Sequence, residues 1–189
     1  MEDKIKKDAL RKLFLEKRDN TSFDLMKIAS SQIQKRLKRI RVFKDAQKIG
    51  AYFPIGSEIQ TQDIIQEVLA SGKEMFLPKV IGNEMEFRKI SDFSSLEKGS
   101  FEIMEPRKEC PVENNLDVII VPIVAISPSG VRLGYGHGYY DRFLSKNKTN
   151  TIALTLEKQI VKNIPKTEHD VLIDWIITED RTIETSKIR

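Results

Sequence analysis

A strand-to-helix connection over residues 117–144 constrains the fold of this chain more than any other segment. The run from Asp117 to Pro122 (Asp-Val-Ile-Ile-Val-Pro) is apolar without alternation, which is typical of a strand buried on both faces, as in a parallel sheet. Tyr140, Phe143 and Leu144 then recur at the i, i+3, i+4 spacing of one helix face. A buried strand followed by an amphipathic helix predicts an α/β fold.

The chain between that strand and that helix is rich in glycine. Gly134, Gly136 and Gly138 remove side chains from the loop, so that backbone N–H groups can approach a ligand, and the N-terminus of the following helix adds positive potential. Arg132 and Arg142 stand on either side with guanidinium groups that fit phosphate oxygens. The loop is neither a Walker loop nor a full Gly-x-Gly-x-x-Gly fingerprint, so a flexible turn is the alternative to a phosphate-binding loop.

Composition bounds the class of protein. The 189 residues suffice for one domain, residues 1–189, and apolar residues make up 40% of the chain. Apolar runs are too short to span a membrane, and the start of the chain does not resemble a signal peptide. The single cysteine, Cys110, forms no internal disulfide, so we expect a cytoplasmic protein. The net charge is +4, and the dense basic run at residues 35–41 predicts a solvated helix face rather than a nucleic-acid contact.

The remaining segments predict the rest of a sheet and its helices. Apolar runs predict strands at residues 49–53, 73–80, 117–121, 151–156 and 173–178, with a hairpin partner at 85–89 and an edge at 182–184. Helical patterns cover residues 4–18, 22–40 and 61–72, and residues 91–116 predict a polar surface connection. We therefore expect a single α/β domain, a mostly parallel sheet flanked by helices on both sides, with ligands at the carboxyl ends of the strands.

The predicted N-terminal helix carries a row of cations. Lys7, Arg11 and Arg18 fall within roughly 40° of one another on a helix of about 3.6 residues per turn. A solvated basic face and a polyanion site both fit this pattern. Glu58 follows the strand at 49–53, and both an exposed loop carboxylate and a ligand contact fit its position.

Four stretches resemble motifs of one known family. They are Arg-Leu-Gly-Tyr-Gly-His-Gly-Tyr-Tyr-Asp-Arg-Phe-Leu at residues 132–144, Lys7-Asp8-Ala9-Leu10-Arg11, the Tyr-x-Pro-x-x-x-Glu-x-x-Thr pattern at 52–61, and Phe-Glu-Ile-Met-Glu-Pro at 101–106. The chain thereby resembles the 5-formyltetrahydrofolate cyclo-ligases (methenyltetrahydrofolate synthetases) from residue 7 to about residue 178. Glu102 departs from that family, which usually has glycine there.

The resemblance implies an ATP site, a folate site and a metal site. For ATP it implies Lys7, Asp8, Ala9, Leu10, Arg11, Arg132, Leu133, Gly134, Tyr135, Gly136, His137, Gly138, Tyr139 and Tyr140. For a reduced folate it implies Phe53, Glu58, Tyr135, Gly136, His137, Gly138 and Tyr139, with Met85 and Phe87 as further walls. It implies catalytic roles for Lys7, Arg11 and Arg132, a further phosphate contact at Arg18, and Mg²⁺ at Asp141 and Asp174.

Several of these residues also have plain structural explanations. Asp141 suits the first turn of a helix, Asp174 suits the end of a strand, and His137 suits an exposed loop position. Met85 and Phe87 alternate onto one face, as core residues of a strand do.

The activity that the resemblance implies is ATP-dependent cyclisation of 5-formyltetrahydrofolate to 5,10-methenyltetrahydrofolate, with release of ADP and phosphate. ATP would phosphorylate the formyl oxygen, and N10 would then close the ring. The implied partner is a reduced folate, with or without a polyglutamate tail; we expect no nucleic acid, no membrane and a monomer or weak oligomer. Two other classes stay open, namely another phosphate-ligand enzyme such as a sugar-phosphate isomerase and a basic RNA-binding module.

Overall fold

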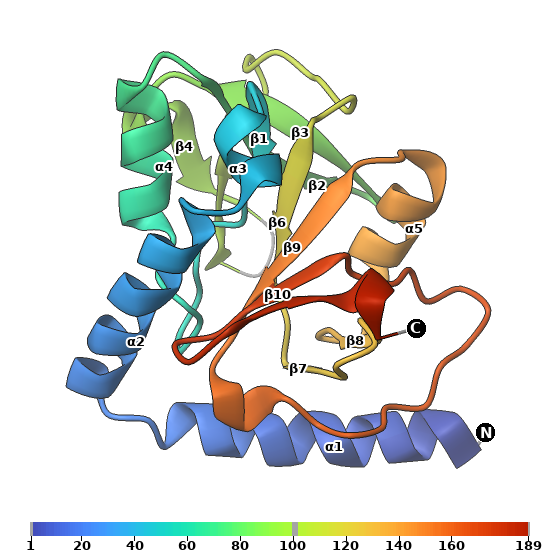
Figure 1. The fold of residues 1–189 in the computed structure, drawn as a ribbon. Coiled ribbons are helices and arrows are strands. Elements are labelled where there is room, and N and C mark those ends of the chain that lie inside the picture. The colour runs from blue at the N-terminus through green and yellow to red at the C-terminus, as the bar shows by residue number, and fades with distance from the viewer. Residues whose placement is uncertain (1, 100–101, 189) are drawn as a thin grey trace.

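The computed structural model describes residues 2–99 and 102–188 and shows one central sheet with helices around it (Figure 1). The strands of the central sheet are β1 (Lys48–Gly50), β2 (Glu74–Ile81), β3 (Glu84–Ile90), β6 (Val118–Val121), β9 (Asn150–Leu154), β10 (Trp175–Ile177) and β11 (Thr182–Glu184). Two hairpins lie outside it, β4 (Leu96–Lys98) with β5 (Met104–Pro106) and β7 (Ala125–Ile126) with β8 (Arg132–Leu133). The helices are α1 (Glu2–Asp19), α2 (Phe23–Leu37), α3 (Arg41–Asp45), α4 (Gln62–Ala70) and α5 (Tyr139–Lys146), with 3-10 helices at Phe93–Ser95, Glu157–Gln159 and Thr185–Lys187.

The order of the seven strands is β11-β10-β9-β6-β1-β2-β3. The five inner strands run parallel to one another, whereas β3 and β11 pair antiparallel at the two edges. The prediction of a mostly parallel α/β sheet flanked by helices is therefore confirmed. The chain leaves β1 toward β2 on one side and leaves β6 toward β9 on the other, which makes the carboxyl ends of β1 and β6 a topological switch point. Open α/β sheets bind ligands at such points.

The central strand β6 shows why the sheet needs helices on both faces. Val118 and Ile120 pack into one hydrophobic cluster with α2 and α4, while Ile119 and Val121 pack into a second cluster with α5. All four side chains are fully buried. The absence of polar alternation in the sequence thus reflects burial on both faces.

Helix α1 lies across the lower edge of the sheet in Figure 1, against the β7–β8 hairpin. Its apolar side packs through Phe14 into a third cluster, which also contains Val124, Ala125, Val131 and Leu133. These partners follow the carboxyl end of β6, so α1 covers the edge of the sheet where a ligand site is expected. No helix in the described part of the chain combines the length and the apolar content that a membrane span needs.

The structure differs from the sequence prediction at one helix end and at two hairpins in particular. The helix predicted at 22–40 ends at Leu37, because Ile40 turns to an extended conformation and is buried in the core before α3 begins. The surface connection predicted at 91–116 contains the β4–β5 hairpin. A second hairpin, β7–β8, separates β6 from the glycine loop, and its turn at residues 127–130 closes with a hydrogen bond from Gly130 N to Ser127 O at a positive φ of 90°.

The departure at Glu102 has a backbone consequence. Glu102 has a φ of 59°, in the left-handed region, and among the described residues it is the one non-glycine residue with positive φ. A glycine at this position would adopt the same conformation without strain. Glu102 forms an ion pair with Lys98, but both side chains are largely exposed, and such a pair contributes little to stability.

We predict that Glu102→Gly raises the free energy of unfolding by about 0.5–1 kcal/mol, because relief of about 1–2 kcal/mol of left-handed strain outweighs the roughly 0.5–1 kcal/mol entropic cost of glycine. Urea unfolding measures this change. The matched control is Glu109→Gly, an exposed glutamate without positive φ, which should lose stability. Equal destabilisation of both variants would contradict the strain at residue 102.

Candidate functional site

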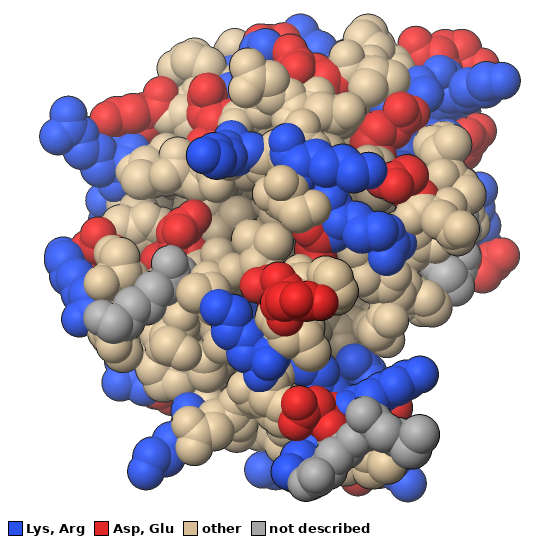
Figure 2. Space-filling model, turned by 90° about the vertical axis from the view of Figure 1, so that its right-hand side faces the viewer, with Lys and Arg blue, Asp and Glu red and all other residues tan. Residues whose placement is uncertain are grey.

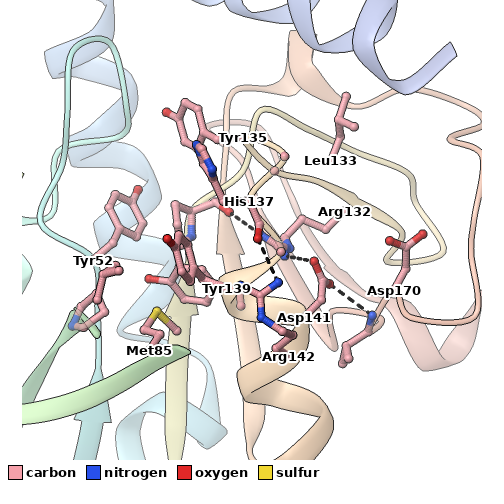
Figure 3. A pocket seen from close by; sticks show the side chains of 18 of the residues that line it. Tyr52, Met85, Arg132, Leu133, Tyr135, His137, Tyr139, Asp141, Arg142 and Asp170 are labelled. Carbon is pink, nitrogen blue, oxygen red and sulfur yellow. Dashed lines mark hydrogen bonds and ion pairs between the residues drawn. The ribbon is translucent and has the colours of Figure 1, made fainter. Parts of the chain in front are cut away.

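A cavity of about 960 Å³ opens at the carboxyl edge of the sheet. Its walls come from α1, the loop after β1, the β2–β3 hairpin, strand β5, the glycine loop with α5, and residues 167–171. In the view of Figure 3, Tyr52 and Met85 lie on one side, Asp141 and Asp170 on the other, and the glycine loop with His137 lies between them. The cavity thus lies at the edge of the sheet where the sequence predicts that ligands collect.

The glycine loop presents its backbone to this cavity. Gly136 and Gly138 have positive φ values of 104° and 72°, and Gly138 is the N-cap residue of α5. Since glycine has no side chain, no capping hydrogen bond satisfies the first-turn amides of α5. The positive end of the helix therefore borders the cavity, as an anion site requires.

The glycines also make room for arginine side chains. A Cβ atom on Gly134 would lie 2.8 Å from Nη1 of Arg132, and one on Gly136 would lie 3.4 Å from Cζ of Arg11. Nε of Arg11 donates to the carbonyl oxygen of Gly134 over 2.7 Å. The loop thus brings the guanidinium groups of α1 and β8 against its own backbone.

Arg142 holds the loop to the neighbouring hairpin. Its Nη1 donates to the carbonyl oxygen of His137 over 3.0 Å, and its Nη2 donates to the carbonyl oxygen of Asn83 over 2.7 Å. A Cβ atom on Gly138 would lie 2.7 Å from Nη1 of Arg142. Arg142 lines the cavity together with Arg132 and ties the glycine loop to the β2–β3 hairpin.

Two cations in the cavity form ion pairs with carboxylates. Nη2 of Arg132 lies 2.7 Å from Oδ2 of Asp141, and Nζ of Lys7 lies 2.6 Å from Oδ2 of Asp170. Arg11 forms a third pair, with Asp8 on its own helix. The side chains of Lys7 and Arg11 are only 15% and 18% exposed, so these cations line the cavity rather than a solvated helix face.

Two buried polar atoms of the cavity lack hydrogen-bond partners among the described residues. They are Nε of Arg132 and the hydroxyl oxygen of Tyr140. The guanidinium of Arg132 stacks over the ring of Tyr140 with a separation of 5.5 Å, so the two atoms belong to one part of the wall. Burial raises the pKa of Tyr140, which keeps its hydroxyl protonated as a donor. Unsatisfied buried groups of this kind are expected where a ligand completes the hydrogen bonding.

The structure does not bring Asp174 to Asp141. Asp174 immediately precedes β10, and its Oδ2 accepts hydrogen bonds from N and Oγ1 of Thr151 near the start of β9. These are the amino ends of two parallel strands, whereas the cavity lies at the carboxyl ends. A residue at the start of a strand cannot reach the opposite edge of the sheet.

Asp170, rather than Asp174, is the carboxylate that shares the cavity wall with Asp141. It lines the same wall as Asp141, whose Oδ1 accepts a hydrogen bond from the backbone N of Val171 over 3.3 Å. Burial alone would raise the pKa of Asp170, but hydrogen bonds from Lys7 and Thr167 outweigh it and lower that pKa. Asp170 is therefore held as an anion. Asp170 and Asp174 are only four residues apart in the sequence, so their spacing alone does not show which of them reaches the cavity.

Glu58 is buried, contrary to the alternative of an exposed loop carboxylate. Only 4% of its surface is exposed. Its Oε1 accepts from the hydroxyl of Tyr135 over 2.6 Å, and its Oε2 accepts from the backbone N of Ile55 over 2.9 Å. Burial raises the pKa of Glu58, and the hydrogen bonds from Tyr135 and Ile55 offset part of that rise.

The apolar walls agree in part with the prediction. Phe53 and Met85 line the cavity, but Phe87 is fully buried in the core, where its ring packs on Phe143 at 5.0 Å. His137 stacks on Tyr139 at a ring separation of 5.9 Å in the middle of the site (Figure 3).

Most residues of the two predicted ligand sites line this one cavity. From α1 these residues are Lys7, Asp8 and Arg11, and every residue from Arg132 to Asp141 also lines the cavity. Ala9 and Leu10 do not line it, because the helix turns Ala9 to solvent and Leu10 toward the cluster under β7 and β8. Arg18 does not line it either. Lys4 is a further cation of the wall that the motif did not include.

The surface charge agrees with the prediction for the basic run. Lys38 pairs with Glu67 and Arg41 with Asp45, as in a solvated helix face. Among the described residues of the face shown in Figure 2, basic side chains are interspersed with acidic ones.

Comparison with known proteins agrees with this geometry. Residues 3–179 match the model of the 5-formyltetrahydrofolate cyclo-ligase family. The chain is similar to a probable 5-formyltetrahydrofolate cyclo-ligase of Caenorhabditis elegans, with 33% identity over 84% of this chain and 89% of the relative. Its fold is similar to the solved 5,10-methenyltetrahydrofolate synthetase of Aquifex aeolicus, with a TM-score of 0.85 and 35% identity over 95% of this chain and 92% of that chain. The synthetase of Mycoplasma pneumoniae follows with a TM-score of 0.75 and 27% identity over 92% and 98%. The chain therefore belongs to the 5-formyltetrahydrofolate cyclo-ligase family.

Proposed function

We propose that this protein converts 5-formyltetrahydrofolate and ATP to 5,10-methenyltetrahydrofolate, ADP and phosphate. The observation that carries the proposal is the division of one cavity into two chemically different halves. One half gathers the cations Lys7, Arg11 and Arg132 beside the glycine loop, and the other places Glu58 among aromatic and apolar side chains. A volume of about 960 Å³ lies at the upper end of the roughly 300–1,000 Å³ typical of small-molecule sites, which suits two ligands.

The cationic half suits a polyphosphate. Guanidinium groups fit phosphate oxygens in two-pronged contacts, and the uncapped N-terminus of α5 adds backbone donors. Hydrogen bonds and ion pairs to Gly134, Asp141 and Asp170 fix the three cations in advance. Preorganised charge of this kind favours a transition state in which negative charge spreads over a transferring phosphoryl group.

Asp141 and Asp170 are the residues that would hold Mg²⁺ in this proposal, and Asp170 replaces the predicted Asp174. Mg²⁺ in nucleotide sites is commonly bound by one or two carboxylates together with phosphates of the substrate, and these two side chains lie on the cationic wall. No cluster of three or more metal-ligating side chains occurs in the described ranges, which fits an ion that arrives with the nucleotide. Bound there, the ion would supply positive charge to the polyphosphate.

The other half suits a reduced pterin. Glu58 presents a carboxylate to the donor-rich edge of the amino-pyrimidinone ring, and Phe53, Met85 and Tyr139 offer apolar surface to its faces. Since Glu58 is buried, a hydrogen bond to it would be strong. The glycine loop lies between the two halves. In this proposal the reacting formyl group and the terminal phosphate meet beside that loop.

The reaction then needs positioning more than a strong base. The formyl oxygen on N5 attacks the γ-phosphorus, the bond to the bridging β–γ oxygen breaks, and ADP leaves. N10 attacks the formyl carbon of the resulting phosphorylated imidate, the carbon–oxygen bond breaks, and phosphate departs as N10 loses its proton. Lys7, Arg11 and Arg132 bind the oxygens on which charge develops.

The remaining expectations concern the cellular compartment, the oligomeric state and the form of the substrate. We propose that it acts in the cytoplasm as a monomer or weak oligomer on a reduced folate, with or without a polyglutamate tail. The family match favours this activity over a sugar-phosphate isomerase and over an RNA-binding module.

The first prediction concerns the activity itself. Protein mixed with 5-formyltetrahydrofolate, ATP and Mg²⁺ should produce the absorbance of the methenyl product, and one phosphate should be released per product. Omission of ATP, or addition of EDTA, should abolish the signal. Equal product formation in EDTA would refute the metal requirement. ATP hydrolysis that is indifferent to formylfolate would indicate another phosphate-ligand enzyme.

The second prediction concerns the cations of α1. Lys7→Ala and Arg11→Ala should each lower turnover by about 10²–10³, as loss of one preorganised donor does elsewhere. Arg11→Lys should also impair turnover, because it keeps the charge but loses the planar fork. The control is Lys12→Ala, a fully solvated lysine on the same helix.

Initial rates and thermal midpoints of these four variants are measured side by side. Stability should change by less than about 1 kcal/mol, as for most partly exposed ion pairs. Wild-type rates in the Lys7 and Arg11 variants would contradict the proposal that these two side chains bind the polyphosphate.

The third prediction concerns Glu58. Glu58→Gln should raise the Michaelis constant for formylfolate by roughly 10- to 100-fold, since a hydrogen bond to a charged group contributes about 1.5–3 kcal/mol, and should leave ATP binding within about threefold. Steady-state kinetics and direct nucleotide binding measure the two effects. An unchanged constant for folate would contradict the assignment.

The same variant has a pH signature in stability. Because burial raises the pKa of Glu58 in the folded protein above the ordinary value of 4.5, the folded state holds this proton to higher pH than the unfolded state does. Wild-type stability therefore falls, through this group, as pH rises from about 4.5 through the raised pKa. Glu58→Gln does not titrate and should gain stability relative to wild type over that range in urea unfolding. Glu109→Gln is the exposed control, and a pH-independent difference at Glu58 would contradict the raised pKa.

A further inference from the structure

Arg18 is a buried cation that lies behind the site rather than in it. It is 5% exposed and does not line the cavity. Its Nε donates to Oγ of Ser57 over 2.9 Å, its Nη1 to the carbonyl oxygen of Ile123 over 3.3 Å, and its Nη2 to the hydroxyl of Tyr135 over 2.9 Å. One guanidinium on α1 thus joins the loop after β1, the segment after β6 and the glycine loop.

The contact with Tyr135 fixes the direction of a hydrogen-bond relay. Arginine only donates, so the phenol oxygen of Tyr135 accepts from Arg18, and its hydrogen is free for another acceptor. That acceptor is Oε1 of Glu58, over 2.6 Å. The relay Arg18–Tyr135–Glu58 therefore aims a proton donor at the carboxylate that is proposed to bind folate.

The relay also bears on the charge of Glu58. The ionisable groups that face this carboxylate are Arg18 on α1, Tyr135 in the glycine loop, Tyr52 after β1 and Tyr140 on α5. The three tyrosines are neutral, because burial raises their pKa values. Arg18 is thus the cation that favours the ionised form of Glu58 against the effect of burial.

We propose that Arg18 is a positioning residue for the folate half of the cavity, which holds Tyr135 and Glu58 in their binding geometry without touching either substrate. The inference rests on the proposed function of Glu58. It assigns two positions along one face of α1 to the two substrates, since Lys7 and Arg11 line the nucleotide half directly, whereas Arg18 acts on the folate half through the relay. A structural bridge of α1 to the sheet is the alternative explanation of the same contacts.

The test compares Arg18→Met and Arg18→Lys with two controls on the same helix. Phe14→Leu disturbs the buried contact between α1 and the β7 region, and Lys12→Met removes an exposed charge. The Michaelis constant for formylfolate, the dissociation constant for ADP measured by direct binding, and the thermal midpoint are determined for each variant. If Arg18→Met does not fold, Tyr135→Phe breaks the relay and keeps the buried cation.

Arg18→Met and Tyr135→Phe should raise the Michaelis constant for folate by roughly 10- to 100-fold, the range expected for loss of a charge-assisted hydrogen bond, and leave the ADP constant within about threefold. Arg18→Lys should recover part of the loss, since it keeps the charge but cannot reach three acceptors with a planar fork. Phe14→Leu should lower the thermal midpoint without a folate-specific effect, and Lys12→Met should match wild type.

A pH profile separates positioning from plain stability. In Arg18→Met the pKa of Glu58 should rise further, so the acidic limb of the folate profile should move to higher pH than in wild type. Arg18→Lys should restore most of that shift, and in Glu58→Gln the limb should be absent.

The outcomes distinguish this inference from the function on which it rests. If wild-type protein forms no methenyl product, the proposed function fails. If wild type is active but Arg18→Met changes folate and ADP binding equally, or follows Phe14→Leu in every measurement, Arg18 is a structural bridge and the inference is overturned. An acidic limb that does not move in Arg18→Met would overturn it as well.

Discussion

The packing of α1 across the carboxyl edge of the sheet is the contact on which the site depends. Phe14 on one side of the helix is buried against the segment after β6, and this fixes the rotation of the helix about its axis. Once that side is buried, the 3.6-residue period carries Lys7 and Arg11 to the cavity. A parallel sheet gathers the ends of its strands at one edge, but those ends alone form an open rim. The helix adds a wall to this rim and supplies Lys7 and Arg11, which join Arg132 of β8.

Charge in this cavity is arranged in pairs rather than as a bare positive cluster. Lys7 faces Asp170 and Arg132 faces Asp141, each within hydrogen-bond distance. Several partly buried cations close together would repel one another and would lose hydration, and a carboxylate for each removes much of both penalties. The same carboxylates are the hard oxygen ligands that a divalent ion prefers. One set of acids can therefore hold the cations in place and also receive the ion that accompanies a nucleotide.

The sequence predicted the parts of the molecule that local pattern controls. The uninterrupted apolar run at β6, the helix face at Tyr140 and Phe143, and the glycine loop between them all lie where they were expected. The sequence does not predict as well which residues from distant segments meet at one edge of the sheet. Asp170 and Asp174 differ by four residues, and only the start of β10 decides that Asp174 lies at the far edge of the sheet. The β7–β8 hairpin is not evident in the sequence, because each of its strands has only two residues and so has no pattern of its own.

Arg18 is a second residue whose position in the fold does not follow from sequence pattern alone. Helical geometry places its side chain near those of Lys7 and Arg11, and on angle alone the three cations are equivalent. Distance along the helix separates them, because the two turns between Arg11 and Arg18 carry the latter past the cavity and under the loop after β1, where it meets Ser57 and Tyr135. A buried arginine that satisfies acceptors on three segments constrains all of them at once, since moving any one leaves a buried donor unpaired. Under the proposed role of Glu58, affinity for folate depends on how α1 packs against the sheet as well as on the residues that touch the ring.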